Sequence, residues 1–328
     1  MTSRAPVIAV TNLKGGVGKS TTTLMLAEGL AYQYGLNVLV YDFDAQANLS
    51  ELLLTSQGVQ RERNQDRGVA AILDTFVPDS DKTIEDLRIV VEQWNATVID
   101  DLVRKKNRNK EQGWVSLLAA DPSMRFLEPF LERSPGKDWF DIGDELINRL
   151  EQATKFERNQ ADIIIIDCPP HVSTLCRAAL KMADFYVTPT LAETLSIWGL
   201  RQFSTWMTHT DQTPWLAKSC GASFDERQFV VCTRFIPTSR SHQTAFEGLK
   251  LDWPNRTFSS PIGARVSMNS ELPRKTINSL HSFGSRYRGK LKQDVTRLAD
   301  EFTAFLQQHR PDLQWSRIQH GNFLTKSL

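Results

Sequence analysis

The sequence has little of what marks several large classes of protein. It has only four cysteines, none of them in a C-x-x-C pair, which argues against a disulfide framework and against a zinc knuckle. It also lacks any apolar run close to the roughly 20 residues that a bilayer span requires. Its first residues do not have the layout of a signal peptide, because their apolar run is short. We therefore expect a cytoplasmic protein with reduced thiols and no membrane partner.

Net charge is nearly absent as well, at +1 over 328 residues, so any surface for nucleic acid must be local. Apolar residues, by contrast, are ample for a core, at 41% of the chain. Continuous apolar runs at 7–10, 38–41 and 163–166 are typical of parallel strands buried on both faces. A helical pattern from Thr22 to Tyr34 follows the first run. The sequence therefore predicts an α/β fold with a mostly parallel central sheet and helices on both faces.

The segment from Lys14 to Thr21, KGGVGKST, is a glycine-rich turn between the first predicted strand and helix. Its glycines allow a tight turn that points backbone N–H groups at an anion, and the helix N-terminus adds partial positive charge. Lys19 would interact with the β and γ phosphates of a nucleotide, and the Ser20 hydroxyl would complete the coordination shell of Mg²⁺. The segment thus predicts a phosphate-binding loop.

This loop departs from the general pattern G-x-x-x-x-G-K-S/T. Leu13 stands in place of the first glycine, and a second lysine, Lys14, follows it. Two ammonium groups crowded on one phosphate would repel each other. We therefore expect Lys14 to have a different target from Lys19.

Three acidic residues follow predicted strands, where the ligand site of an open α/β sheet lies. Asp42 and Asp44 come at the end of the run that begins at Val38, and Asp167 ends a run of four isoleucines. Asp42 and Asp44 can point toward the same phosphate and metal region, and Asp167 is placed to hold the Mg²⁺ shell through water. Ordinary helix capping is the alternative role for either residue of the first pair.

Together these segments resemble the deviant Walker A loop and the Walker B strand of the ParA/MinD ATPases. The stretch DAQAN, residues 44–48, is similar to that family's D-P-Q-G/A-N segment, with Ala45 in place of proline. This stretch and Leu13 favour the ParA (Soj-like) branch. The resemblance implies that Lys14 crosses a dimer interface to the nucleotide of the other subunit and that Asp44 positions the attacking water.

The resemblance also implies ATP and Mg²⁺ as cofactors, together with a set of site residues. The catalytic residues would be Lys14, Lys19 and Asp44. The residues that bind the nucleotide would be Lys14, Gly15, Gly16, Val17, Gly18, Lys19, Ser20, Thr21 and, in the segment that contacts the base, Arg234. The residues that hold the metal would be Ser20, Asp42 and Asp167.

We expect a single P-loop ATPase domain over residues 1–309. Within it, residues 56–113 have no clear pattern and are treated as an insert, whose basic cluster at 104–110 is either a solvated loop or a second contact with an anionic polymer. Residues 310–328 lack periodicity and predict a tail. Further strands are expected at 114–119, 184–188 and 228–233, and the helix after the second of these is expected to begin at Pro189.

The near-neutral total charge conceals a basic segment, because residues 234–297 hold twelve Lys or Arg against four acids. Several of these cations lie at the start of a predicted helix, where they oppose its dipole. A phosphate backbone is the obvious partner and a solvated basic face is the alternative. The resemblance adds Arg265, at a position that Soj-like proteins use for DNA. The candidate DNA contacts are Arg240, Arg265, Arg286, Arg288, Lys290 and Lys292.

The resemblance implies a slow ATPase that forms a homodimer in the ATP state and binds double-stranded DNA of the nucleoid without sequence preference. A ParB-like centromere- or cargo-binding protein would stimulate hydrolysis and release it, so that plasmid or chromosomal DNA, or another cargo, is segregated. The alternative is a MinD-like membrane-associated positioning ATPase, for which residues 322–328 are too short and polar an anchor. A reductase like the nitrogenase iron protein would require paired cysteines, which the sequence lacks.

Overall fold

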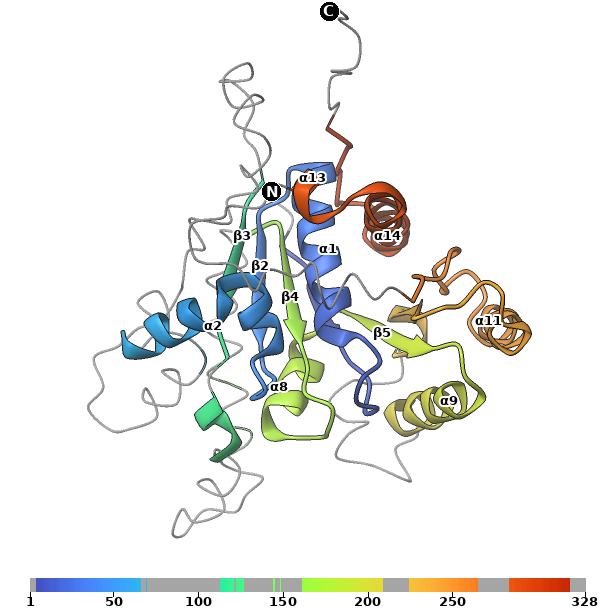
Figure 1. The fold of residues 1–328 in the computed structure, drawn as a ribbon, viewed down its shortest axis with the longest axis horizontal. Helices are drawn as coiled ribbons and strands as arrows, with labels where there is room; N and C mark the ends of the chain where they lie inside the picture. Colours follow the sequence, from blue (N-terminus) through green and yellow to red (C-terminus); the bar gives the residue numbers. More distant parts are fainter. Residues whose placement is uncertain are drawn as a thin grey trace, which may run out of the picture.

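The computed structural model describes residues 4–65, 113–120, 122–126, 161–208, 224–264 and 283–318, together with residues 69, 144 and 148. Within them, six parallel strands form a sheet in the order β3-β2-β4-β1-β5-β6 (Figure 1). The strands are β1 (Val7–Val10), β2 (Val38–Asp42), β3 (Val115–Leu118), β4 (Ile163–Asp167), β5 (Phe185–Leu191) and β6 (Gln228–Thr233). The helices are α1 (Lys19–Tyr34), α2 (Asn48–Asn64), α8 (Thr174–Met182), α9 (Thr194–Thr208), α11 (Arg240–Asp252), α13 (Phe283–Arg286) and α14 (Gly289–His309), with short 3₁₀ turns at Pro122–Phe126 and Asp225–Arg227.

Different helices cover the two faces of the sheet (Figure 1). Along β1, Val7 and Ala9 belong to the core that includes residues of α8, α9 and α11, whereas Ile8 and Val10 belong to the core that includes residues of α1, α2 and α14. Successive side chains of a strand point to opposite faces, so a strand covered on both sides must be apolar throughout. This arrangement explains the continuous apolar runs and confirms the predicted fold class.

Helix α14 packs closely against α1, the helix that follows the glycine-rich loop. The approach depends on Gly29, because a Cβ atom there would lie 3.1 Å from Val295 Cγ1 and 3.2 Å from Ala299 Cβ. The apolar residues predicted for this helix are buried, with Leu298 and Phe302 fully so. The basic N-terminal end of α14 is therefore fixed to the helix of the phosphate loop.

The expected end of the strand at residue 188 is wrong, since β5 continues through Pro189 to Leu191 and α9 begins only at Thr194. Proline is tolerated here because the pairing of β5 with β1 ends at Val187, so no ladder hydrogen bond to β1 is lost. Beyond the end of β1, the side chain of Asn12 donates a hydrogen bond to the Pro189 carbonyl, 2.8 Å away.

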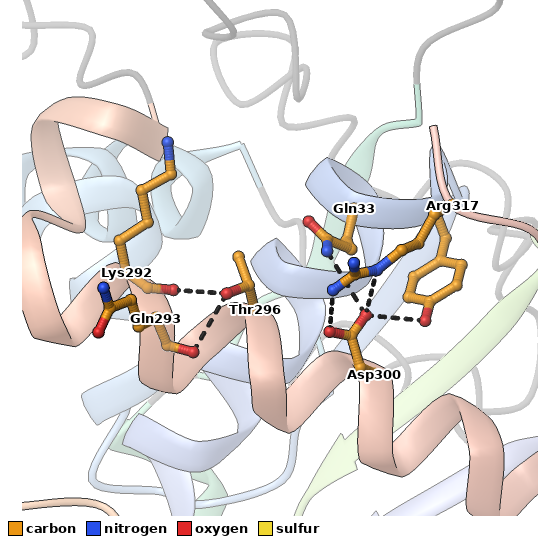
Figure 2. A network of polar contacts seen from close by, with 7 residues as sticks. Gln33, Lys292, Gln293, Thr296, Asp300 and Arg317 are labelled. Carbon is orange, nitrogen blue, oxygen red and sulfur yellow. Dashed lines mark hydrogen bonds and ion pairs between the residues drawn. The ribbon is translucent and has the colours of Figure 1, made fainter. Parts of the chain in front are cut away.

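The predicted domain boundary at residue 309 is too early. Leu313 is buried in the core with α1 and α14, and the Ile318 N–H donates to the Gln33 carbonyl at 2.9 Å. Figure 2 shows the guanidinium of Arg317 on the Asp300 carboxylate, which also accepts a hydrogen bond from the Tyr34 hydroxyl at 2.9 Å. Residues 310–318 therefore pack onto the domain across α1 and α14.

Two other expectations fall largely outside the described residues. Of the predicted insert at 56–113, residues 56–64 form the end of α2, and the basic cluster at 104–110 is not among the described residues. Arg265 also lies outside them. Among the helices that the structure describes, none combines the length and the hydrophobicity of a membrane span.

Candidate functional site

The glycine-rich loop lies at the carboxyl edge of the sheet, between β1 and α1. Gly16 and Gly18 adopt left-handed φ angles of 74° and 89°, which glycine accepts without strain. Gly18 is also the residue that precedes the first turn of α1, and no side chain of the described residues caps that turn. The loop and the helix end therefore present free backbone donors and a positive dipole end to an anion.

Lys19 is the cation at the base of this loop. Its side chain is nearly buried, at 7% exposed, and its ammonium lies 3.4 Å from the Lys14 carbonyl oxygen. Burial lowers the pKa of Lys19, and the negative charge of Asp167 partly opposes this effect. Within the described part of the chain no carboxylate forms a tight ion pair with this buried ammonium, which suits it to a phosphate that enters the loop.

Asp167, at the end of β4, meets the requirement for a metal site. Its Oδ1 accepts a hydrogen bond from the Thr23 hydroxyl at 3.3 Å, while its buried Oδ2 has no hydrogen-bond partner among the residues that the structure describes. The Ser20 hydroxyl also interacts with this carboxylate. Burial and then the charge of Asp42 raise its pKa well above the ordinary value, so a cation would relieve the cost of ionising it. A hydrated Mg²⁺ held by Ser20 and Asp167 fits this environment.

Asp42 is paired with Asp167 across β2 and β4, but its oxygens already have partners. Its Oδ2 accepts hydrogen bonds from the Ser50 hydroxyl at 2.7 Å and the Ser50 N–H at 2.9 Å, and its Oδ1 lies 3.2 Å from the Asp44 N–H. Burial raises its pKa to about 7. Asp42 thus anchors the start of α2 to the sheet, and its role at the metal stays a prediction.

Asp44 lies in the tight turn that joins β2 to α2. Its Oδ1 accepts a hydrogen bond from the Gln46 N–H at 2.9 Å, and Ala47 takes a left-handed φ of 55°. The residue is 7% exposed. The turn holds this carboxylate at the same edge of the sheet as Asp42 and Asp167.

Lys14 lies apart from the phosphate cradle of its own loop. Its ammonium contacts the hydroxyl of Ser196, in the first turn of α9, and lies 3.4 Å from Oε2 of Glu193, the residue before that helix. Its backbone N–H donates to Asn12 Oδ1 at 2.9 Å. The Ser196 hydroxyl also lies 3.3 Å from Glu193 Oε2, so these two side chains form one acceptor site. The position of Lys14 is thus consistent with the prediction that its target differs from that of Lys19. Sequence reasoning missed Ser196, because a single serine in a helix forms no recognisable motif.

Comparison with known proteins places this site in a family. A family model described as "AAA domain" matches residues 5–217, well over half of the chain. The sporulation initiation inhibitor protein Soj of Bacillus subtilis is 30% identical over 196 residues, and the chromosome partitioning protein ParA of Myxococcus xanthus is 28% identical over 204 residues. The chain belongs to the ParA/MinD family of P-loop ATPases.

The match to these ParA/MinD relatives is partial in length. It spans 60% of this chain and 62% of Soj, and 62% of this chain and 57% of the Myxococcus protein. Their activities and partners therefore do not transfer to this chain without further tests.

Solved structures support the fold over nearly the whole chain. A putative plasmid partition protein of Borrelia burgdorferi bound to AMPPNP has a TM-score of 0.62 at 19% identity, covering 92% of this chain and 99% of its own. Cobyrinic acid a,c-diamide synthase of Mycobacterium smegmatis, with bound ADP and magnesium, has a TM-score of 0.59 at 18% identity, covering 96% and 99%. Because these neighbours carry different names, the likeness shows the fold alone.

At the end of β6, Thr233 joins the ParA/MinD loop to the sheet. Its hydroxyl donates to the Val17 carbonyl at 2.7 Å, and the neighbouring Arg234 is exposed with a left-handed φ of 53°. Sequence reasoning named Arg234 but not Thr233. Many strands end in a threonine, so the sequence gives no signal that this one contacts the loop. Only the fold reveals the contact.

The candidate DNA contacts divide into two groups. Arg240, Arg288 and Lys290 are exposed, and Lys292 is half-buried with its ammonium 5.3 Å from the centre of the Tyr32 ring. Arg286 differs, and its prediction as a DNA contact is wrong. It is buried, 3.0 Å from Glu28 Oε1, and Tyr287 donates a hydrogen bond to the other oxygen of Glu28. The Arg286 side chain therefore ties α13 to α1 and is not part of the surface.

Proposed function

We propose that this protein is a ParA-like partition or positioning ATPase that acts as an ATP-dependent dimer. One observation carries the proposal. The loop already has Lys19 at its base as the cation expected to serve a phosphate, and yet it contains a second lysine whose ammonium contacts Ser196 of α9, away from Lys19. A triphosphate bound to a second subunit would give Lys14 a target, since Lys19 is the cation expected to serve the phosphate of its own subunit.

The proposed reaction is hydrolysis of ATP, and each residue has a separate part in it. The loop N–H groups and Lys19 bind and orient the phosphates, and Asp44 holds the attacking water in line with the bond that breaks. Mg²⁺ supplies charge neutralisation when it is bound by Ser20 and Asp167. Lys14 of the second subunit stabilises the charge that develops in the transition state. Hydrolysis cleaves the bond between the β and γ phosphates to give ADP and inorganic phosphate, so Lys14 of the second subunit loses the triphosphate that it contacts and the dimer is expected to open.

The proposed DNA surface comprises the exposed cations Arg240, Arg288 and Lys290 and the half-buried Lys292, together with Arg265. In this proposal the dimer associates with the nucleoid in the cytoplasm, and a ParB-like centromere- or cargo-binding protein stimulates turnover and releases it. The cations at the start of α14 support this surface, because they oppose the helix dipole and a DNA phosphate would relieve that cost. Contacts of this kind are made to phosphates and carry no sequence preference.

The test is binding of the full-length protein to a fluorescent duplex without a particular sequence, measured with AMPPNP and Mg²⁺, with ADP and with no nucleotide. We expect binding only with AMPPNP, and a fall in affinity of about 10³-fold between 50 and 200 mM salt if six phosphates are contacted. Equal binding without nucleotide, or no dependence on salt, would contradict the proposal. Vesicles of anionic lipid take the place of DNA in a parallel assay, and nucleotide-dependent binding to them would favour the MinD-like alternative.

A further inference from the structure

One face of α1 carries two side chains that contact the chain just before α14 (Figure 1 shows α13 and α14 beside α1). Glu28 and Tyr32 are four residues apart and therefore share that face. Glu28 Oε1 lies 3.0 Å from the Arg286 guanidinium, and the other oxygen of Glu28 accepts a hydrogen bond from the Tyr287 hydroxyl. The Tyr32 ring stacks on the Phe283 ring, with their centres 4.0 Å apart. The helix that begins in the phosphate loop thus holds the segment that leads into α14.

This segment stands directly before an unfavourable helix start. The first turn of α14 contains Lys290 and Lys292 but no acidic residue, and among the described residues no side chain caps it. Cations at this position oppose the helix dipole, and N–H groups without a cap favour fraying. Tyr287, one residue before Arg288, is only 2% exposed. The start of α14 is therefore fixed by its contact with α1 and not by a cap of its own.

The same face of α1 also contacts one of the cations directly. The ammonium of Lys292 lies 5.3 Å from the centre of the Tyr32 ring, a distance at which a cation is attracted to the face of an aromatic ring. Because Tyr32 is itself stacked on Phe283, the position of this ring is set by its neighbours. A lysine that is already ordered loses less conformational entropy when it binds a ligand.

We propose that Glu28 and Tyr32 are positioning residues for DNA, which hold Arg288, Lys290 and Lys292 at a fixed spacing for the phosphates of a duplex. The inference rests on the DNA surface of the proposed function and names the residues that order it. Glu28 is 6% exposed and carries the wrong charge for DNA, so its effect on DNA must pass through the residues that it holds. Phosphates of a duplex have a regular spacing, which favours cations ordered in advance over cations on a frayed helix end.

The experiment compares two tyrosines that each lose only a hydroxyl. Tyr287→Phe removes the hydroxyl that contacts Glu28 and keeps the buried ring. Tyr34→Phe is the matched control, because the Tyr34 hydroxyl on α1 donates to Asp300 on α14 at 2.9 Å. Asp300 lies eight residues after Lys292, about 12 Å along the helix, so this contact joins the same two helices far from the basic start (Figure 2).

Binding of the full-length protein to a fluorescent duplex is measured with AMPPNP and Mg²⁺ between 50 and 200 mM salt. We expect Tyr287→Phe to raise the dissociation constant about fivefold or more and to make the logarithmic dependence on salt shallower by about one to two, since each lost phosphate contact removes about 0.9 from the slope. Tyr34→Phe should change the dissociation constant by less than about twofold and leave the slope as it is. Tyr32→Leu, which removes the ring beneath Lys292, should act as Tyr287→Phe does.

Urea unfolding and the affinity for a fluorescent ATP analogue, measured on each variant, separate positioning from stability. If Tyr287→Phe and Tyr34→Phe weaken duplex binding alike, or if neither changes it, the inference is wrong and the proposed DNA surface stands. A fall in nucleotide affinity as large as the fall in duplex affinity in Tyr287→Phe would also overturn the inference, because the contact would then act on α1. If the wild-type protein does not bind the duplex with AMPPNP, the proposed surface and the inference are both wrong.

Discussion

At the carboxyl edge of the sheet, around the glycine-rich loop, Lys19, Asp42 and Asp167 are all less than a tenth exposed. At the start of α14, by contrast, Arg288 and Lys290 are exposed. In the first region, hydrogen bonds from Ser50 and the Asp44 N–H hold Asp42 in place, whereas Asp167 and Lys19 are buried with few polar contacts among the described residues. The cations at the start of α14 stay in contact with solvent and are free to adjust to a ligand. Substitutions in the first region are therefore expected to remove function or stability outright, and those in the second to weaken binding by increments.

The largest expected effect tests whether Lys14 acts on another subunit. We expect Lys14→Ala to lower the ATP turnover number by about 10³-fold or more, the scale of a cation that contacts the transition state from a second protein. The affinity of the monomer for a fluorescent ATP analogue should change little, because Lys14 lies apart from its own phosphate site. Lys19→Ala is the matched control and should lose nucleotide binding itself. A comparable loss of ATP affinity in both variants would remove the distinction between the two lysines.

A second test compares two arginines that are neighbours in the sequence but belong to different regions. Arg286 is buried against Glu28, and Arg288 is exposed. Arg286→Ala should lower the free energy of unfolding by about 3 kcal/mol or more, because it leaves a buried carboxylate without its cation. Arg288→Ala should change stability by less than about 0.5 kcal/mol and weaken DNA binding. Urea unfolding and the duplex assay measure both quantities, and equal stability of the two variants would contradict the assignment.

These two arginines also show how far the sequence could lead. The six strands, the phosphate loop and the acidic residues at the strand ends were predictable, because a buried parallel sheet forces long apolar runs and brings the ends of its strands together. The burial of Arg286 was not predictable, because the sequence does not distinguish a cation that forms an ion pair inside the protein from one that faces DNA. The roles of Ser196, Ser50 and Thr233 were hidden for the same reason, as each acts across a long separation in the chain.

The next effect concerns pH and the buried carboxylate of Asp42. Its pKa is raised from 3.8 to about 7, so between these values the native state keeps a proton that the unfolded state has released. Stability should therefore fall as the pH rises from about 4 to 7, by up to about 4 kcal/mol for this group, and then level off. Asp167 and Glu28 also have raised pKa values and act in the same direction, so the measurement needs a comparison.

Asp42→Asn supplies that comparison, because the amide cannot titrate. Unfolding by urea in buffer without Mg²⁺, at pH 5 and pH 7.5, should show a smaller loss of stability in Asp42→Asn than in the wild-type protein. Identical losses would mean that Ser50 and the backbone of residue 44 keep Asp42 ionised throughout this range.

The smallest expected effect concerns the hydroxyl that connects β6 to the phosphate loop. Thr233 donates to the Val17 carbonyl at 2.7 Å, and Thr233→Val keeps the shape of the side chain while removing this donor. One hydrogen bond of this kind is worth about 1 kcal/mol, so nucleotide affinity should fall about fivefold. Thr233→Ser retains the hydroxyl and should restore most of the affinity. If valine and serine behave alike, packing of residue 233 against Gly18 rather than the hydrogen bond holds the loop on β6.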